Sequence, residues 1–274
     1  VGGVGDMLAV FVSFPDWYLA HRLGMDSTYS GLAKNLVGPL DELLLEHAEG
    51  IRSGKMGSVA MLAKIIALGG LAMSLSHATT PMSGFEHVMS HVLDLQAEIN
   101  HAPLAMHGSQ VALATLAGAE MYRCFLSDFD PLALNLDDCY PTMHFMKARI
   151  ESGFAEIDPT GKAGAECWAD YSQKLEKWHA HRKDFEAVLK EWDSIRALLD
   201  AETRSPEMIQ RILQAVDAPT LWSQLNPPVD EKSVRYAFMH ASLMRKRLTL
   251  GDLLIFTGWD RETLWNKIWK DFAQ

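Results

Sequence analysis

Residues 163–201 read AGAECWADYSQKLEKWHAHRKDFEAVLKEWDSIRALLDA. Large apolar side chains recur through this stretch, with charged residues between them; they are Trp168, Tyr171, Leu175, Trp178, Phe185, Leu189 and Trp192. Apolar residues that return every three or four positions line one face of a helix. A stripe of this kind is usually core or a seam between helices, and it contains no cofactor-binding pattern. The stretch therefore predicts a long helix packed against other helices.

The helical period extends over nearly all 274 residues of the chain. Further helices are expected over residues 4–23, 32–51, 56–76, 83–100, 105–126, 140–154, 208–215, 231–247, 250–256 and 261–272. No run of alternating apolar residues is long enough to predict a strand. We therefore expect an all-α, multi-helix fold in which residues 1–274 form one helical domain. A division into two subdomains, at about residues 1–127 and 128–274, stays open.

Three local features refine the expected helices. Pro39 should bend or divide the helix over residues 32–51, because proline lacks the amide hydrogen that a helix interior needs. Ser83 is a candidate N-cap, with Glu86 three positions later as in a capping box. Residues 56–76 are apolar over the length of a membrane span. Because Lys64 lies in the middle and Gly and Ala are frequent, we expect this helix at the centre of the domain and no membrane partner.

Composition limits the classes of function. The net charge of −10 argues against a nucleic-acid partner, which would require a basic patch. Residues Arg245-Lys246-Arg247 are expected on the solvated face of one helical turn. The three cysteines form no Cys-x-x-Cys pair, which disfavours a disulfide framework or a thiolate zinc site and favours a reducing, cytoplasmic setting. The start of the sequence contains no signal-peptide pattern.

Histidines gather in one part of the chain. His87 and His91 are four positions apart, so a helix would project both from one face, and His107 follows at the expected start of the next helix. Asp6, close to Gly5, is a candidate carboxylate. Two imidazoles and a carboxylate suit zinc, iron or nickel and leave a position for substrate or water. By spacing alone, satisfied or surface histidines and an N-cap aspartate remain the more common explanation.

At these residues the sequence resembles a known family. The resemblance rests on an ordered set of short motifs: Gly5-Asp6-Met7-Leu8, Asp16-Trp17, Leu19-Ala20-His21, Gly70-Leu71-Ala72-Met73, Pro81-Met82-Ser83-Gly84, Glu86-His87, Ser90-His91, His107-Gly108, Gln110-Val111, His240-Ala241, residues 245–249 and Gly258. They resemble the metal-binding domain of sn-glycerol-1-phosphate dehydrogenases. Glycerol dehydrogenases, iron-containing alcohol dehydrogenases and dehydroquinate synthase belong with this family. The resemblance is weakest between about residues 128 and 217.

The resemblance implies a division of roles among the site residues. Asp6, His87 and His107 match the family's metal ligands. His91 matches a second histidine that serves proton transfer or substrate binding in relatives. Val10 stands where the three-histidine iron enzymes place another ligand, which favours the Asp–His–His version of the site.

The resemblance also implies a cofactor. The complete enzyme would use NAD(H) or NADP(H), held by an N-terminal nucleotide-binding domain whose glycine-rich loop is not found in this sequence. We therefore expect this chain to be a C-terminal domain or fragment that binds a divalent metal but transfers no hydride alone. A homo-oligomer is compatible with the family.

Three positions depart from the glycerol-phosphate pattern. Val10 stands where a basic residue is usual, Thr80 where arginine is frequent and Ser109 where glutamate is common. The first two changes remove charge that could meet a phosphate. The substrate is therefore expected to be either glycerol 1-phosphate or dihydroxyacetone phosphate, or a polyol without a phosphate.

Three hypotheses of function follow. The first is a metal-dependent NAD(P)-linked polyol or glycerol-1-phosphate dehydrogenase, in which the metal polarises the alcohol or carbonyl and His91 relays a proton. The second is a dehydroquinate-synthase-like lyase, which needs several basic groups that the sequence near Asp6 lacks. The third is a divergent helical interaction module without catalysis.

Overall fold

The computed structural model describes residues 1–37 and 40–272, and this part of the chain is helical with no strand, as predicted. Its α-helices are α1 (Gly2–Leu8), α2 (Val10–Arg22), α3 (Gly31–Val37), α4 (Leu40–Arg52), α5 (Met56–Ser76), α6 (Phe85–Ile99), α7 (His107–Asp128), α8 (Met143–Ala155), α9 (Lys162–Ala180), α10 (Arg182–Lys190), α11 (Trp192–Glu202), α12 (Pro206–Ala215), α13 (Glu231–His240), α14 (Leu250–Phe256) and α15 (Arg261–Phe272). Five short 3-10 helices complete it: η1 (Thr80–Met82), η2 (Pro131–Ala133), η3 (Leu136–Cys139), η4 (Trp222–Gln224) and η5 (Ala241–Leu243).

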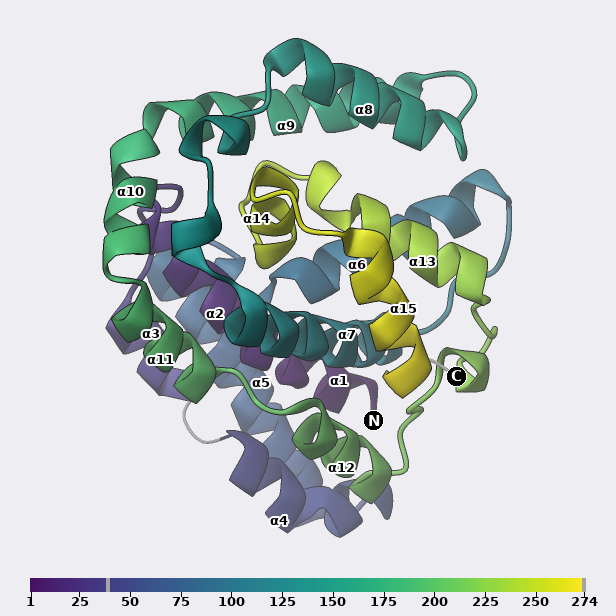
Figure 1. The fold of residues 1–274 in the computed structure, drawn as a ribbon. Coiled ribbons are helices and arrows are strands. Elements are labelled where there is room, and N and C mark those ends of the chain that lie inside the picture. The colour runs from purple at the N-terminus through teal and green to yellow at the C-terminus, as the bar shows by residue number, and fades with distance from the viewer. Residues whose placement is uncertain (38–39, 273–274) are drawn as a thin grey trace.

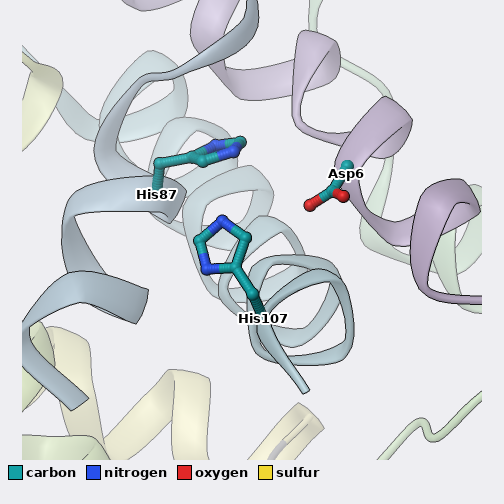
Figure 2. Close-up of side chains that lie close together, drawn as sticks. All are labelled: Asp6, His87 and His107. Atoms are coloured by element: carbon teal, nitrogen blue, oxygen red, sulfur yellow. The ribbon is translucent and has the colours of Figure 1, made fainter. Parts of the chain in front are cut away.

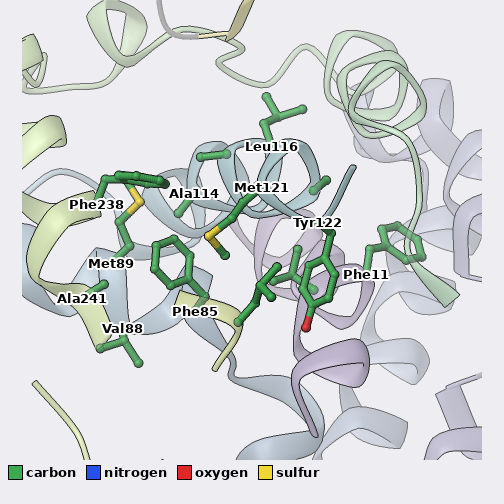
Figure 3. Close-up of a cluster of buried hydrophobic side chains, with 14 of the residues drawn as sticks. Phe11, Phe85, Val88, Met89, Ala114, Leu116, Met121, Tyr122, Phe238 and Ala241 are labelled. Carbon is green, nitrogen blue, oxygen red and sulfur yellow. The ribbon is translucent and has the colours of Figure 1, made fainter. Parts of the chain in front are cut away.

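Helix α7 is the centre of the molecule. In Figure 1 it runs through the middle of the fold, with α1, α2, α6 and α15 packed around it. Nearly every residue of α7 after its first turn is buried, apart from Arg123 and the last turn. A helix that is apolar on all sides must be surrounded by other elements. The core in Figure 3 forms in this way: Met121 of α7 lies beside Phe85 of α6, whose ring lies 5.7 Å from that of Phe238 of α13, measured between the centroids.

The aromatic stretch that predicted one long helix forms three shorter ones. Helices α9, α10 and α11 are separated by single residues, His181 and Glu191. The stripe itself is core as predicted, because Trp178, Phe185 and Trp192 are buried. One straight helix of this length would extend about 60 Å. The bends instead let the stripe follow the curved surface of the core, as the turn from α9 through α11 in Figure 1 shows.

Helix α5 forms where predicted, but its expected place at the centre of the domain is wrong. Only 17% of its most apolar 18-residue window is buried. Ile65 and Ala72 face the core, whereas large apolar side chains on the other faces are exposed; these are Met56, Val59, Ile66, Leu68, Leu71 and Leu75. By length and composition alone this helix could cross a membrane, which for a single helix is weak evidence. Apolar residues occur on all sides of α5, so the sequence does not indicate which face meets the core.

Other predicted helix boundaries also differ, and the helix expected over residues 231–247 ends at His240. The helix expected over residues 4–23 is divided at Ala9 into α1 and α2. Ser83 is not the N-cap of α6, since Gly84 occupies that position. The capping box predicted between Ser83 and Glu86 is also wrong, because Glu86 Oε1 instead accepts a hydrogen bond from Gly84 N at 2.6 Å. Pro39, predicted to bend or divide a helix, lies outside the described residues.

Candidate metal centre

The structure brings together the three residues expected as metal ligands. Asp6 comes from α1, His87 from the first turn of α6 and His107 from the first residue of α7. One ligand atom of each lies within 4.8 Å of the others. In Figure 2 the Asp6 carboxylate and the two imidazole rings face a common space between the helices. Metal bonds to nitrogen and oxygen of about 2.0–2.2 Å would require only a modest closure of this triangle.

Close packing of glycines brings the starts of α1 and α7 together. A Cβ atom at Gly108 would lie 2.1 Å from the carbonyl oxygen of Gly2, a distance that no real side chain could hold. The two backbones therefore touch beside His107 and near Asp6. Gly108 permits this close approach because it has no Cβ atom. Without it, the carboxylate of α1 could not approach the imidazole of α7.

Hydrogen bonds hold one nitrogen of each imidazole and leave the other for an ion. His87 Nδ1 lies 2.9 Å from Glu86 Oε1. His107 Nδ1 lies 3.1 Å from Ser90 Oγ, with Asp94 Oδ2 4.0 Å away. Metal-binding histidines commonly donate their second N–H to a carboxylate or a hydroxyl, which fixes the tautomer and the ring orientation. Both rings therefore present Nε2 as the candidate ligand atom.

An unpaired oxygen marks the same place as a cation site. Asp6 Oδ1 is buried and has no hydrogen-bond partner in the described part of the chain. A buried carboxylate oxygen without a partner is costly, and a bound cation removes that cost. The donor set of one carboxylate and two imidazoles fits a divalent transition metal. The residues present therefore fit a metal ion.

A cavity of about 400 Å³ opens beside the cluster. All three candidate ligands line it, together with His91, Arg247 and apolar residues that include Met7, Met73 and Met82. A pocket of this size, mostly apolar with a few polar groups, is typical of small-molecule sites.

His91 lies next to the cluster without joining it. Its ring stacks on His107, with the ring centroids 5.6 Å apart, and it lines the metal-site cavity. Burial, followed by the nearby charge of Arg245, lowers the pKa of His91 to about 4. The ring is therefore uncharged at neutral pH and able to accept a hydrogen bond. That His91 is not a ligand, and the role assigned to it, both stay predictions.

Two groups of residues at this site were not identified from the sequence. Glu86, Ser90 and Asp94 lie next to Nδ1 of the candidate ligands His87 and His107. Their position on the helix that carries His87 could have indicated them. Arg247 was expected on a solvated helical face, which is wrong. Residues 245–247 follow η5 outside any helix, and Arg247 is half-buried at the metal-site cavity, where it donates to Thr79 Oγ1 at 3.0 Å.

Comparison with known proteins bears on the same part of the chain. No family model matches. The chain is similar to archaeal glycerol-1-phosphate dehydrogenases specified for NAD(P)+. The protein of Haloquadratum walsbyi is 34% identical over 136 residues, which are 50% of this chain and 38% of that protein. The match to Korarchaeum cryptofilum is 35% over 114 residues, covering 42% and 36%. The match to Thermococcus sibiricus is 33% over 157 residues, covering 57% and 41%. The matched region thus spans about two-fifths of these relatives.

Proposed function

We propose that this chain, a relative of the glycerol-1-phosphate dehydrogenases, is the metal-binding part of an NAD(P)-linked dehydrogenase for glycerol 1-phosphate or a related polyol. The observation that supports this most directly is the meeting of Asp6, His87 and His107 at one cavity. The names of the relatives support an oxidoreductase and a nicotinamide cofactor.

The three ligands would hold a divalent ion such as zinc, iron or nickel. When bound, such an ion supplies a Lewis acid that stabilises negative charge on an alcohol or carbonyl oxygen. Glu86 and Ser90 keep the two imidazoles in the orientation that presents Nε2. The apolar lining of the cavity limits water around the reacting carbon, which strengthens electrostatic interactions there.

His91 is the residue that we assign to the substrate hydroxyl. It lines the same cavity as the ligands and has no hydrogen-bond partner within the described residues. In the direction of alcohol oxidation it would receive the hydroxyl proton, and a nicotinamide, when bound, would supply the hydride acceptor. In a full-length enzyme, His91→Asn should lower kcat and leave the metal content unchanged. Loss of metal in that variant would instead make His91 part of the ligand set.

Metal analysis tests the proposal first. After loading with Zn²⁺ and dialysis, the chain should retain about one equivalent of metal, and His107→Ala should retain almost none. His144→Ala is the matched control, because His144 is exposed on α8, away from the cluster. Equal, near-zero metal in the original chain and in His107→Ala would overturn the site.

Turnover tests the reaction class. A full-length protein containing this chain should consume NAD(P)+ in proportion to the polyol or polyol phosphate that is oxidised. A lyase of the dehydroquinate-synthase type regenerates its cofactor and would show no net consumption. A non-catalytic module would bind metal without turnover of either kind.

A further inference from the structure

A network of hydrogen bonds lies behind the candidate ligand His107. Ser90 Oγ is 3.1 Å from His107 Nδ1 and donates to Gln110 Oε1 at 3.0 Å. Gln110 Nε2 in turn donates to Asp94 Oδ1 at 3.0 Å and to the carbonyl oxygen of Ala105 at 3.1 Å. Ser90 and Gln110 are 0% and 2% exposed. The network therefore joins the imidazole to a backbone carbonyl through two buried polar side chains.

Helical spacing places the side chains of this network together. Ser90 and Asp94 are four positions apart on α6, and His107 and Gln110 are three positions apart at the start of α7, so each pair projects from one face of its helix. Helices α6 and α7 pack against each other, which brings the two faces into contact. Ala105 lies just before α7, where its carbonyl oxygen is within reach of Gln110.

The carbonyl of Ala105 fixes the orientation of the Gln110 amide. A carbonyl oxygen can only accept a hydrogen bond, so the amide nitrogen of Gln110 must face it. The opposite orientation would bring two oxygens together at the distance of about 3.1 Å that now separates Nε2 from Ala105 O, and would turn the amide oxygen towards the carboxylate of Asp94. Gln110 Oε1 is therefore held towards Ser90, where it acts as an acceptor.

Ser90 passes this direction on to His107. A serine hydroxyl has one hydrogen to donate, and the bond to Gln110 Oε1 uses it. Towards His107 Nδ1 the same oxygen can then only accept, so Nδ1 must carry a hydrogen. If the hydroxyl turned to His107 instead, the buried Gln110 Oε1 would lose this donor, which is costly. Because a neutral imidazole has a single N–H, Nε2 of His107 keeps its lone pair.

We propose that Gln110 is a positioning residue of the metal centre, which acts through Ser90 to hold His107 in the Nδ1–H tautomer. An imidazole binds a metal through a nitrogen that carries no hydrogen, so a ring held in this tautomer presents Nε2 to the ion without rearrangement. The inference deepens the proposed function and rests on it for the identity of His107 as a ligand.

NMR of the metal-free chain tests the proposal directly. Long-range ¹H–¹⁵N correlation spectra of protein with ¹⁵N-labelled histidine, recorded above neutral pH, distinguish the Nδ1–H from the Nε2–H tautomer. The signal that is missing in His107→Ala identifies His107. The original chain should show the Nδ1–H tautomer at this residue. The Nε2–H tautomer there would overturn the proposal, whether or not any variant at Gln110 folds.

Two substitutions separate a role in the tautomer from a role in packing alone. Gln110→Glu and Gln110→Met both remove the N–H donors to Ala105 and Asp94, but only Gln110→Glu keeps an oxygen that accepts from Ser90. Gln110→Glu should keep the Nδ1–H tautomer of His107. Gln110→Met should lose it and should lower the affinity for Zn²⁺ by about 10–100-fold, as measured by chelator competition. The same tautomer in both variants would overturn the proposal.

Two controls accompany these measurements. Gln214→Met makes the same exchange at an exposed position of α12 and should match the original chain in tautomer and in Zn²⁺ affinity. The tautomer of His87 should stay the same in every variant, because its Nδ1 faces Glu86 and not this network. A chain that binds no Zn²⁺ would contradict the proposed function, whereas the metal-free spectra would still decide the role of Gln110.

Discussion

Gly5 and Gly108 are in direct backbone contact: a Cβ atom placed on Gly5 would lie 1.9 Å from the carbonyl oxygen of Gly108. Each glycine is the immediate neighbour of a candidate ligand, Asp6 in α1 and His107 in α7. The contact therefore sets the distance between the carboxylate and the imidazole, although neither glycine carries a functional group.

Gly5→Ala should accordingly disrupt the metal centre. The methyl group would meet backbone atoms, which cannot rotate away as the end of a side chain can, so α1 must shift relative to α7. We expect at least a tenfold loss of Zn²⁺ affinity with helical content retained, as measured by chelator competition and circular dichroism. Gly57→Ala is the matched control in α5, where an added Cβ meets nothing within 4 Å. Equal metal affinities in the two variants would contradict this account.

Glu86→Gln tests the support of the ligand His87. The amide keeps the size of the side chain but offers a weaker acceptor to His87 Nδ1, now 2.9 Å from the carboxylate. Loss of such supporting groups typically lowers metal affinity by about 10–100-fold. Glu98→Gln, on an exposed position of the same helix, should leave the affinity unchanged. A Glu86→Gln variant with undiminished affinity would show that the carboxylate does not orient the ligand.

Asp16 should make stability depend on pH in an unusual direction. Burial, the largest cause, raises its pKa from 3.8 to about 7, against hydrogen bonds from Tyr122 and from the amides of Leu250 and Phe85. The folded chain then holds this proton up to about pH 7, whereas the unfolded chain loses it near pH 4. The stabilisation from the bound proton is complete below pH 4 and is lost as the pH rises to about 7.

Urea denaturation between pH 4 and pH 8 measures this effect. The free energy of unfolding relative to Asp16→Asn should fall by up to about 4 kcal/mol across that interval, which is the energy that corresponds to the pKa difference. The exposed residue Asp200 provides the control variant Asp200→Asn, for which no such trend is expected. A difference that stays constant with pH would mean that Asp16 is ionised throughout.

Paired substitutions in α5 test which of its faces meets the core. Ile65 is 4% exposed, whereas Leu71 on the same helix is 47% exposed. Ile65→Ala should lower the free energy of unfolding by about 2–5 kcal/mol, because it leaves a cavity. Leu71→Ala should change it by no more than about 0.5 kcal/mol, as is usual for a surface position. Similar losses in both variants would indicate that α5 is covered in solution.

The sequence by itself determined the helical class of this protein and the identity of its candidate ligands. The helical period of the apolar residues is a local property, so most of the helices lie close to the predicted ranges. The order of Asp6, His87 and His107 along the chain likewise carried the family resemblance. The helices follow from residue type and spacing, whereas the assignment of the candidate ligands rests on the resemblance to the family.

Only the tertiary structure decided the rest. The evenly apolar composition of α5 gives no preferred face, so its exposure follows from which helices happen to pack beside it. The sequence predicts a solvated helical turn for the cationic side chains at residues 245–247. In the structure α13 ends at His240 and η5 follows it, which places Arg247 against the metal-site cavity. Contacts between segments more than 160 positions apart, such as Arg247 with Thr79, have no local signature. The candidate ligands could therefore be named from the sequence, whereas the cavity that they line could not.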